Sequence, residues 1–179
     1  MTSHTCEEKR VHVLSTGQLV FTRQALPGDL DLVNVMHQRC TDASRYKRYQ
    51  GVRRALTSVE WARLTNPRYG VTWVTTPSNG SDGVIAVSHL MRTDRDGVHE
   101  LGLLVEDAWQ NRGLGMSLAC HAVHLARRLD CHSVAVMTDA ANTPMLAITR
   151  RLGAFVPPSS SGVVDLVIPV AGAGRCPQG

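Results

Sequence analysis

The sequence has no long hydrophobic run and no block of charge of one sign. No apolar stretch approaches the ~20 residues that a membrane-spanning helix needs. The first ten residues contain acidic side chains and no apolar stretch follows them, unlike a secretory signal. We therefore expect a cytoplasmic protein that does not contact a membrane. The net charge of +4 comes from basic residues dispersed among acidic ones, which argues against a nucleic-acid partner.

Cysteine pairs with ligand or disulfide spacing are also missing. Five cysteines are scattered along the chain without a Cys-x-x-Cys motif, which argues against a disulfide framework and a zinc ribbon. His121 and His124 lie one turn apart on a predicted helix, but only Cys120 lies near them at ligand spacing. We therefore predict reduced thiols and no metal site.

The length of 179 residues and the apolar fraction of 43% indicate one α/β domain with a substantial core. We predict a domain over 18–170, with tails at 1–17 and 171–179. Alternating and turn-bounded apolar runs predict strands, and apolar residues at helical spacing predict helices. In chain order these are a strand at 19–23, helices at 30–40 and 59–64, strands at 71–75, 83–90 and 100–105, a helix at 113–129, a strand at 134–138, a helix at 143–152 and a strand at 163–168.

The connections between these elements predict the sheet topology. Short turns join the strands at 71–75, 83–90 and 100–105, so we expect an antiparallel meander. The long helix at 113–129 is a crossover, so the strands at 100–105 and 134–138 should be parallel.

The most informative segment runs from Gln110 to Gly115, between the strand at 100–105 and the long helix. Glycines let a backbone pass close to a ligand, and the first N–H groups of a helix point outward with the positive end of its dipole. Such a turn binds phosphate. The three glycines of a dinucleotide fingerprint and the Gly-Lys-Ser/Thr of a P-loop are both absent.

The segment from Val105 to Gly115 resembles the acyl-CoA-binding motif of the GNAT superfamily of N-acetyltransferases, Gln/Arg-x-x-Gly-x-Gly/Ala. The order of the predicted elements is similar to that family's fold. The resemblance is strongest to the catalytic domain of bacterial protein lysine acetyltransferases. It is carried by Asp107-x-Trp109-Gln110-x-x-Gly113-Leu114-Gly115, Asn142-x-Pro144-Met145-Leu146 with Arg150-Arg151-Leu152-Gly153, and His37-x-Arg39-x-x-x-x-Ser44-Arg45-Tyr46-x-Arg48.

The resemblance implies a GNAT fold: a mixed central sheet of six to seven strands, a splay between the strands at 100–105 and 134–138, and about four helices. It also implies a coenzyme A site. The main chain of Leu103, Leu104 and Val105 would bind the pantetheine, and Asn142 would touch the cofactor or cap its helix. The residues implied at the pyrophosphate and beside it are Gln110, Asn111, Arg112, Gly113, Leu114, Gly115, Met116, Ser117 and Met145.

Acetyl transfer to an amine needs a proton acceptor. Glu100 is the candidate, because a glutamate at this offset is the proposed base in the lysine acetyltransferases that the chain resembles. We expect apolar neighbours around Glu100; the alternative is a strand-end carboxylate in water. The family often protonates the leaving thiolate with a tyrosine seven residues after the asparagine, where this chain has Thr149.

These features predict an acetyl-CoA-dependent N-acetyltransferase without a metal, acting by direct attack of a protein lysine or a small-molecule amine. The alternative is a catalytically silent CoA-binding or regulatory protein. The basic and aromatic run from Arg45 to Tyr49 suits substrate contact or a lid better than RNA. Family members often dimerise, so a homodimer stays open, as do the acceptor and the acyl-chain length.

Overall fold

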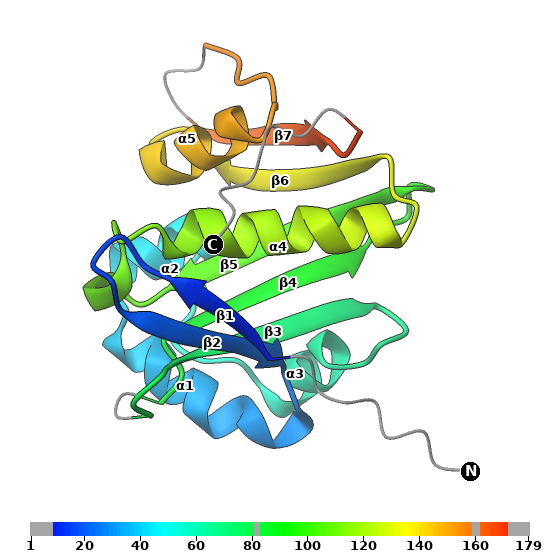
Figure 1. Cartoon of the computed structure of the whole chain (residues 1–179). Helices are drawn as coiled ribbons and strands as arrows, with labels where there is room; N and C mark the ends of the chain where they lie inside the picture. Colours follow the sequence, from blue (N-terminus) through cyan, green and yellow to red (C-terminus); the bar gives the residue numbers. More distant parts are fainter. Residues whose placement is uncertain (1–8, 81–82, 159–161, 172–179) are drawn as a thin grey trace.

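A seven-stranded sheet forms the centre of the molecule (Figure 1). The computed structural model describes residues 9–80, 83–158 and 162–171. The strands lie in chain order across the sheet, and β5–β6 is its one parallel pair among the described residues. Their bounds are β1 Arg10–Val13, β2 Leu19–Gln24, β3 Gly70–Pro77, β4 Ala86–Arg92, β5 Val98–Val105, β6 Ser133–Asp139 and β7 Val163–Pro169. The predicted meander and the predicted parallel pair are confirmed.

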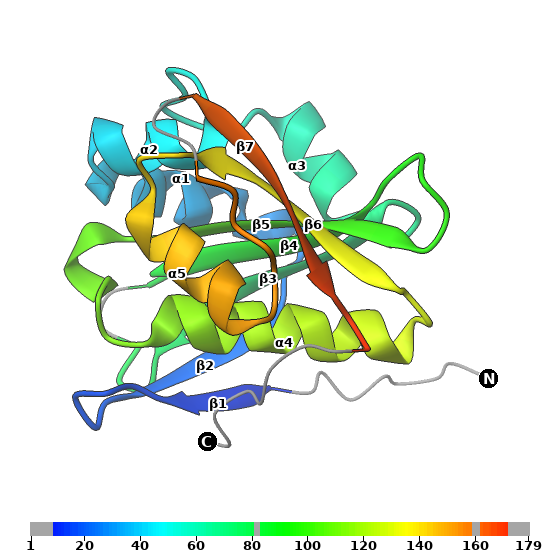
Figure 2. The same ribbon diagram turned by 90° about the horizontal axis from the view of Figure 1, so that it is seen from above.

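Helices cover both faces of the sheet. On one face lie α1 (Leu30–Arg39), α2 (Asp42–Tyr49) and α3 (Ser58–Leu64), and on the other lie α4 (Leu114–Arg128) and α5 (Thr143–Arg151) (Figure 2). The core divides accordingly: one buried cluster lies under α1 and α3, and two lie under α4 and α5. No helix among the described residues is long and apolar enough to cross a membrane.

The long helix α4 follows from the apolar spacing of its sequence. Leu114, Leu118 and Ala122 recur every four residues, and each is at most 1% exposed. Gly113 precedes the helix with a φ of +85°, a left-handed conformation that glycine adopts without steric cost. The chain can therefore turn sharply out of β5 and start α4 beside it.

The two central parallel strands separate soon after they pair. Only Val98, His99 and Glu100 of β5 have partners on β6, at Ser133–Ala135. Beyond Glu100 the edge of β5 that faces β6 has no strand partner in the described part of the chain, whereas its other edge stays paired with β4 as far as Val105. The predicted splay is confirmed, and it leaves the backbone groups of Leu101, Leu103 and Val105 without a strand partner, because the alternate residues of β5 pair with β4.

Two predictions about secondary structure are wrong. Arg10–Val13 belong to the predicted N-terminal tail but form β1, an edge strand with a single buried residue. Asp42–Tyr49, where no helix was predicted, form α2, so the described residues contain five α-helices. Residues 1–8 and 172–179 of the predicted tails lie outside the described residues.

Candidate active site

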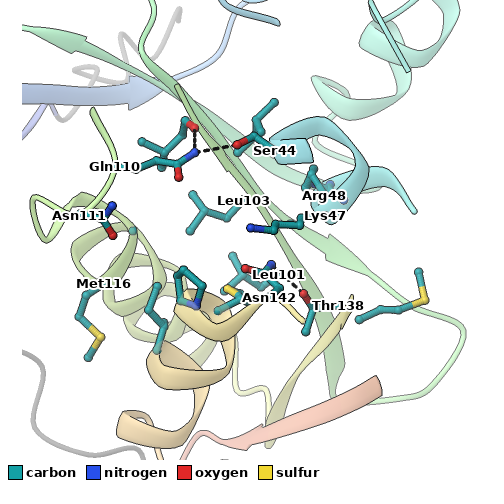
Figure 3. Close-up of a pocket in the computed structure, with 18 of the residues that line it drawn as sticks. Ser44, Lys47, Arg48, Leu101, Leu103, Gln110, Asn111, Met116, Thr138 and Asn142 are labelled. Carbon is teal, nitrogen blue, oxygen red and sulfur yellow. Dashed lines mark hydrogen bonds between the residues drawn. The ribbon is translucent and has the colours of Figure 1, made fainter. Parts of the chain in front are cut away.

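A cavity of about 370 Å³ opens where β5 and β6 separate (Figure 3). Four parts of the chain line it: α2, the free edge of β5, the turn before α4, and the end of β6 with the start of α5. The lining residues are Ser44, Lys47, Arg48, Leu101, Gly102, Leu103, Leu104, Val105, Gln110, Asn111, Gly113, Gly115, Met116, Met137, Thr138, Asn142, Pro144, Met145 and Ile148.

The turn from Asn111 to Met116 presents unpaired donors to this cavity. None of the hydrogen bonds found in the described part of the chain uses a backbone N–H of residues 111–116, and no side chain caps α4. An added Cβ on Gly113 would meet no atom within 4 Å, so the space beside these N–H groups is open. Outward N–H groups at the positive end of a 15-residue helix are suited to an anion of phosphate size.

Gly115 has a different role in the same turn. An added Cβ there would lie 3.1 Å from Cδ1 of Ile148 and 3.7 Å from Cδ2 of Leu103. The absence of a side chain therefore lets the start of α4 pack closely against α5 and β5. This packing keeps the turn and the free strand edge beside one cavity.

Asp107 joins the turn to α2. Its carboxylate accepts hydrogen bonds from the backbone N–H of Thr41 at 2.9 Å and from the hydroxyls of Thr41 and Ser44 at 2.9 and 2.8 Å. Burial alone would raise the pKa of Asp107, but these hydrogen bonds outweigh it and hold the pKa below its ordinary value. A carboxylate thus occupies the N-terminus of α2, where the helix dipole also favours negative charge.

Residues 23–154 match the family model described as an acetyltransferase (GNAT) domain. The chain belongs to the GNAT acetyltransferases. It is therefore an acyltransferase, and the family uses acetyl-CoA as its cosubstrate. The splayed strands, the turn before α4 and the cavity between them lie within the matched residues of this GNAT domain.

Solved structures show the same fold. The GNAT domain of S. lividans PAT superposes with a TM-score of 0.78 at 22% identity, covering 90% of this chain and 96% of that one. The cAMP-binding acyltransferase from Mycobacterium smegmatis gives 0.65 at 22% identity; the match covers 97% of this chain but 50% of that protein. The ribosomal-protein-S18-alanine N-acetyltransferase from Escherichia coli gives 0.64 at 14% identity, covering 84% and 94%.

Ten of the site residues that the sequence predicts line the cavity of this GNAT domain. They are Leu103, Leu104, Val105, Gln110, Asn111, Gly113, Gly115, Met116, Asn142 and Met145. Gln110 also connects α2 to the end of β5, because its side-chain amide donates to Ser44 Oγ at 3.0 Å and to the carbonyl of Val105 at 2.9 Å.

Three other predicted residues do not bring their side chains into the cavity. The Arg112 guanidinium donates to Oε1 of Gln18 at 2.7 Å and lies 5.1 Å from the Trp109 ring centroid. Leu114 is 1% exposed and packs in the core, and Ser117 is not among the lining residues. Arg112 and Leu114 do not line the cavity either, and of these three residues only they have a backbone N–H without a hydrogen bond in the described part of the chain.

Glu100 is exposed and does not line the cavity. The expectation of apolar surroundings is therefore wrong, and the alternative of a strand-end carboxylate in water describes its position. It does share the α2 side of β5 with Gly102, as the period of two predicts. Glu100 is also the last residue of β5 that pairs with β6, so it lies where the splay begins.

The two residues that the motif singles out at the start of α5 and within it, Asn142 and Thr149, differ in access to the cavity. Asn142 precedes the helix without capping it; its side-chain amide donates to Oγ1 of Thr138 at 2.9 Å and faces the cavity (Figure 3). Thr149 is fully buried, and its hydroxyl donates to the helix carbonyls of Met145 and Leu146, each at 3.1 Å. Thr149 therefore presents no proton donor to the cavity.

The sequence motifs did not predict several of the lining residues. Leu101 and Gly102 extend the predicted strand edge by two residues, and Met137, Thr138, Pro144 and Ile148 flank the predicted asparagine. Ser44, Lys47 and Arg48 come from α2, in a segment that the sequence marked as basic and aromatic. Cys40, Cys120 and Cys131 are buried and lie outside the lining, and burial raises the pKa of Cys40 to about 12. The described residues contain no cluster of three or more His, Cys, Asp or Glu side chains suited to a metal ion.

Proposed function

We propose that this GNAT domain is an acetyl-CoA-dependent N-acetyltransferase that acetylates a primary amine, either a protein lysine or a small molecule. One observation carries the proposal: the open N–H groups of residues 111–116 and the unpaired edge of β5 border the same cavity. The turn suits the pyrophosphate of coenzyme A, and a strand edge with free backbone groups suits its amide-containing pantetheine arm.

The residues present fit such a cosubstrate along the whole cavity. Open space beside Gly113 leaves room for phosphate oxygens at the turn. The main-chain groups of Leu103 face the gap left by β6, whereas those of Leu104 point toward β4, and the Val105 carbonyl already accepts a hydrogen bond from Gln110. Met145 and Asn142 also line the cavity. Acetyl-CoA supplies the activated acyl group, and the protein positions and polarises it.

Direct attack by the amine in a ternary complex fits the residues at this site. No cysteine lies among the described residues that line the cavity, so no thiol is placed to carry the acetyl group. Glu100 accepts the proton of the acceptor through water, because its carboxylate lies outside the cavity at the start of the splay. A backbone N–H near Leu104 stabilises the oxyanion. The thiolate leaves without help from Thr149, since a thiol pKa near 8.5 makes it a tolerable leaving group.

A second candidate function is a silent or regulatory CoA-binding protein. The buried hydroxyl of Thr149 and the position of Glu100 outside the cavity favour it. Glu100→Gln separates the two candidates. If Glu100 is the catalytic base, Glu100→Gln lowers kcat by about 10²- to 10⁴-fold while CoA binding stays unchanged. Tight CoA binding with negligible turnover in both the wild type and the variant supports the silent protein.

The proposal is tested by release of free thiol from acetyl-CoA in the presence of a panel of amines: lysine peptides, protein N-termini, polyamines, aminoglycosides, aryl amines and amino acids. We expect amine-dependent release of CoA with at least one class, and mass spectrometry should show an acceptor heavier by one acetyl group. Absence of amine-dependent release across the panel, with CoA bound in calorimetry, would overturn the proposed activity and leave the CoA site standing.

A further inference from the structure

The guanidinium of Arg48 lies directly on the backbone of Gly102, beside the cavity. Arg48 comes from the last turn of α2, and both residues line the cavity (Figure 3). A Cβ on Gly102 would overlap Nη2 and Cζ of Arg48, so this stretch of β5 admits the guanidinium only because residue 102 has no side chain. Two features far apart in the sequence thus combine to place one positive charge against the start of the splay.

Arg48 has no acidic partner among the described residues. Its Nε is buried without a hydrogen-bond partner, and no carboxylate oxygen lies within ion-pair distance of it. Its nearest aromatic contact is the Tyr49 ring, whose centroid lies 5.0 Å from Cζ. Other arginines on this side of the molecule do have partners: Arg23 with Asp29, Arg39 with Glu106, Arg45 with Asp42 and Arg53 with Glu60. Arg48 is partly exposed with its Nε buried, so its guanidinium can bind an anion that enters the cavity.

The surroundings of Arg48 do not neutralise it. Lys47 and Arg48 are the charged residues that line the cavity in the described part of the chain, and both are positive. His89 lies opposite Gly102 on β4, and burial, followed by the charge of Arg48, holds its pKa well below the ordinary value, so the ring is neutral. Glu100 lies near enough to act on Arg48 electrostatically but is exposed and forms no ion pair with it. The end of the cavity at Gly102 therefore has an unsatisfied positive charge.

We infer that Arg48 binds an anionic group of the acceptor, a carboxylate that can lie about 7 Å from the amine to be acetylated. This inference rests on the proposed function. The planar guanidinium matches a carboxylate with paired N–H donors, and such recognition is specific in geometry as well as charge. Glu100 and Gly102 lie two residues apart on one strand face, about 7 Å. An acceptor with its amine toward Glu100 and its carboxylate on Arg48 spans that distance.

The test compares matched acceptors that differ only in the carboxylate. The first arm uses β-alanine, γ-aminobutyrate and 5-aminovalerate, each against its primary amide. The second arm uses short peptides in which lysine adjoins glutamate or glutamine. A preference in the first arm indicates a free amino acid as the acceptor, and a preference in the second arm indicates an acidic segment of a protein. We expect kcat/KM to favour the carboxylate by at least about tenfold in one arm.

Four variants assign that preference to Arg48. Arg48→Gln should remove the preference, and Arg48→Lys should keep part of it. Gly102→Ala should reduce it while the arginine is still present, because the new Cβ displaces the guanidinium. Lys47→Gln removes a charge from the same cavity and should leave the preference in place. If the wild type shows no preference for the carboxylate, or if the preference survives Arg48→Gln, the inference is overturned. It is also overturned if Arg48→Gln changes the Kd of CoA and leaves the carboxylate preference unchanged.

A binding measurement covers the case in which no amine is acetylated. The N-acetyl forms of the same acids and amides are titrated into the CoA-loaded protein by calorimetry. Carboxylate-dependent binding that Arg48→Gln abolishes, with the Kd of CoA within twofold of the wild type, supports the inference even if the proposed activity fails. Equal binding of the acids and amides, or binding of neither at millimolar concentration, counts against the assignment of Arg48.

Discussion

The side-chain amide of Gln110 donates a hydrogen bond to Ser44 Oγ at 3.0 Å, and this bond connects the turn before α4 with helix α2. Ser44 in turn donates to Asp107, which also holds Thr41 at the start of α2. The proposed phosphate site and the helix that carries Arg48 are therefore fixed to each other by one polar network. Binding of CoA at the turn and binding of the acceptor beside α2 should therefore both depend on Gln110, Ser44 and Asp107.

Asp107→Asn tests this network. The amide would place a donor against the N–H of Thr41 and remove the charge from the N-terminus of α2, so we expect a loss of about 1–3 kcal/mol in the free energy of unfolding. Urea denaturation measures it. Asp42→Asn is the matched control, since Asp42 is an acidic residue in the first turn of α2 itself but is 88% exposed, and it should cost far less. Equal losses in the two variants would contradict a role for Asp107 as the anchor of α2.

Gly113→Ala separates the ligand space at the turn from the backbone cost of the substitution. Gly113 has a φ of +85°, so alanine there costs about 1–2 kcal/mol of stability, and its Cβ enters the open space beside the N–H groups. Gly80→Ala, at a φ of +65° and also with no atom within 4 Å of the added Cβ, should bring a similar backbone cost away from the cavity. We expect calorimetry to show a CoA Kd at least about tenfold weaker for Gly113→Ala alone. The same Kd in the two variants would argue against phosphate at Gly113.

Thr149→Val tests whether the residue at the family's tyrosine position takes part in catalysis. The Thr149 hydroxyl bonds only to helix carbonyls and is fully buried, so we expect kcat in the thiol-release assay to stay within about twofold of the wild type. Thr149→Tyr should instead lower the Tm, because a buried site has no room for the ring. A tenfold drop in kcat for Thr149→Val, at unchanged CoA affinity, would show that the hydroxyl does reach the leaving group.

The burial of His12 leads us to expect a loss of folding stability in mild acid. Burial, followed by the charge of Arg10, lowers its pKa to about 4 in the folded protein, against about 6.5 unfolded. The unfolded chain therefore binds more protons between these values, so stability is fully present above pH 6.5 and falls as the pH drops toward 4. The expected loss from pH 7 to pH 5 is about 2 kcal/mol from this residue.

Urea denaturation of the wild type and His12→Phe across that pH range measures the effect. The variant should lose less stability on acidification than the wild type. Its pH dependence should not vanish, because His121, whose ring centroid lies 6.3 Å from that of His12, also has its pKa lowered to about 4 by burial first and Arg10 second. Parallel curves for the two proteins would contradict the assignment to His12.

The elements that bury apolar residues at regular spacing could be predicted from the sequence. Leu114 and Leu118 on α4, and the apolar runs of β3 to β6, give strong periodic signals because each buries one or both faces. Helix α2 buries no residue completely, so it has no apolar stripe to detect. Its remaining signal was local: Thr41 as the N-cap, whose side chain accepts from the N–H of Ser44, with Asp42 in the first turn.

The chemistry of the site was predictable only where a local motif carries it. Residues 110–116 form one continuous turn, so spacing and the family resemblance identify them together. Arg48 and Gly102 are 54 positions apart, and only the fold brings a guanidinium onto a glycine. The exposure of Glu100 was likewise a property of the sheet, because alternation gives the face of a strand but not how far a covering helix extends along it.

The most direct test of the coenzyme A site is an NMR titration of ¹⁵N-labelled protein with CoA. A pyrophosphate at the turn and a pantetheine arm on β5 predict the largest amide shifts at Gly113, Leu114, Gly115 and Met116, followed by Leu103 and Val105 on the free edge of β5. Saturation of binding with these amides unmoved, and shifts clustered elsewhere on the protein, would contradict this placement.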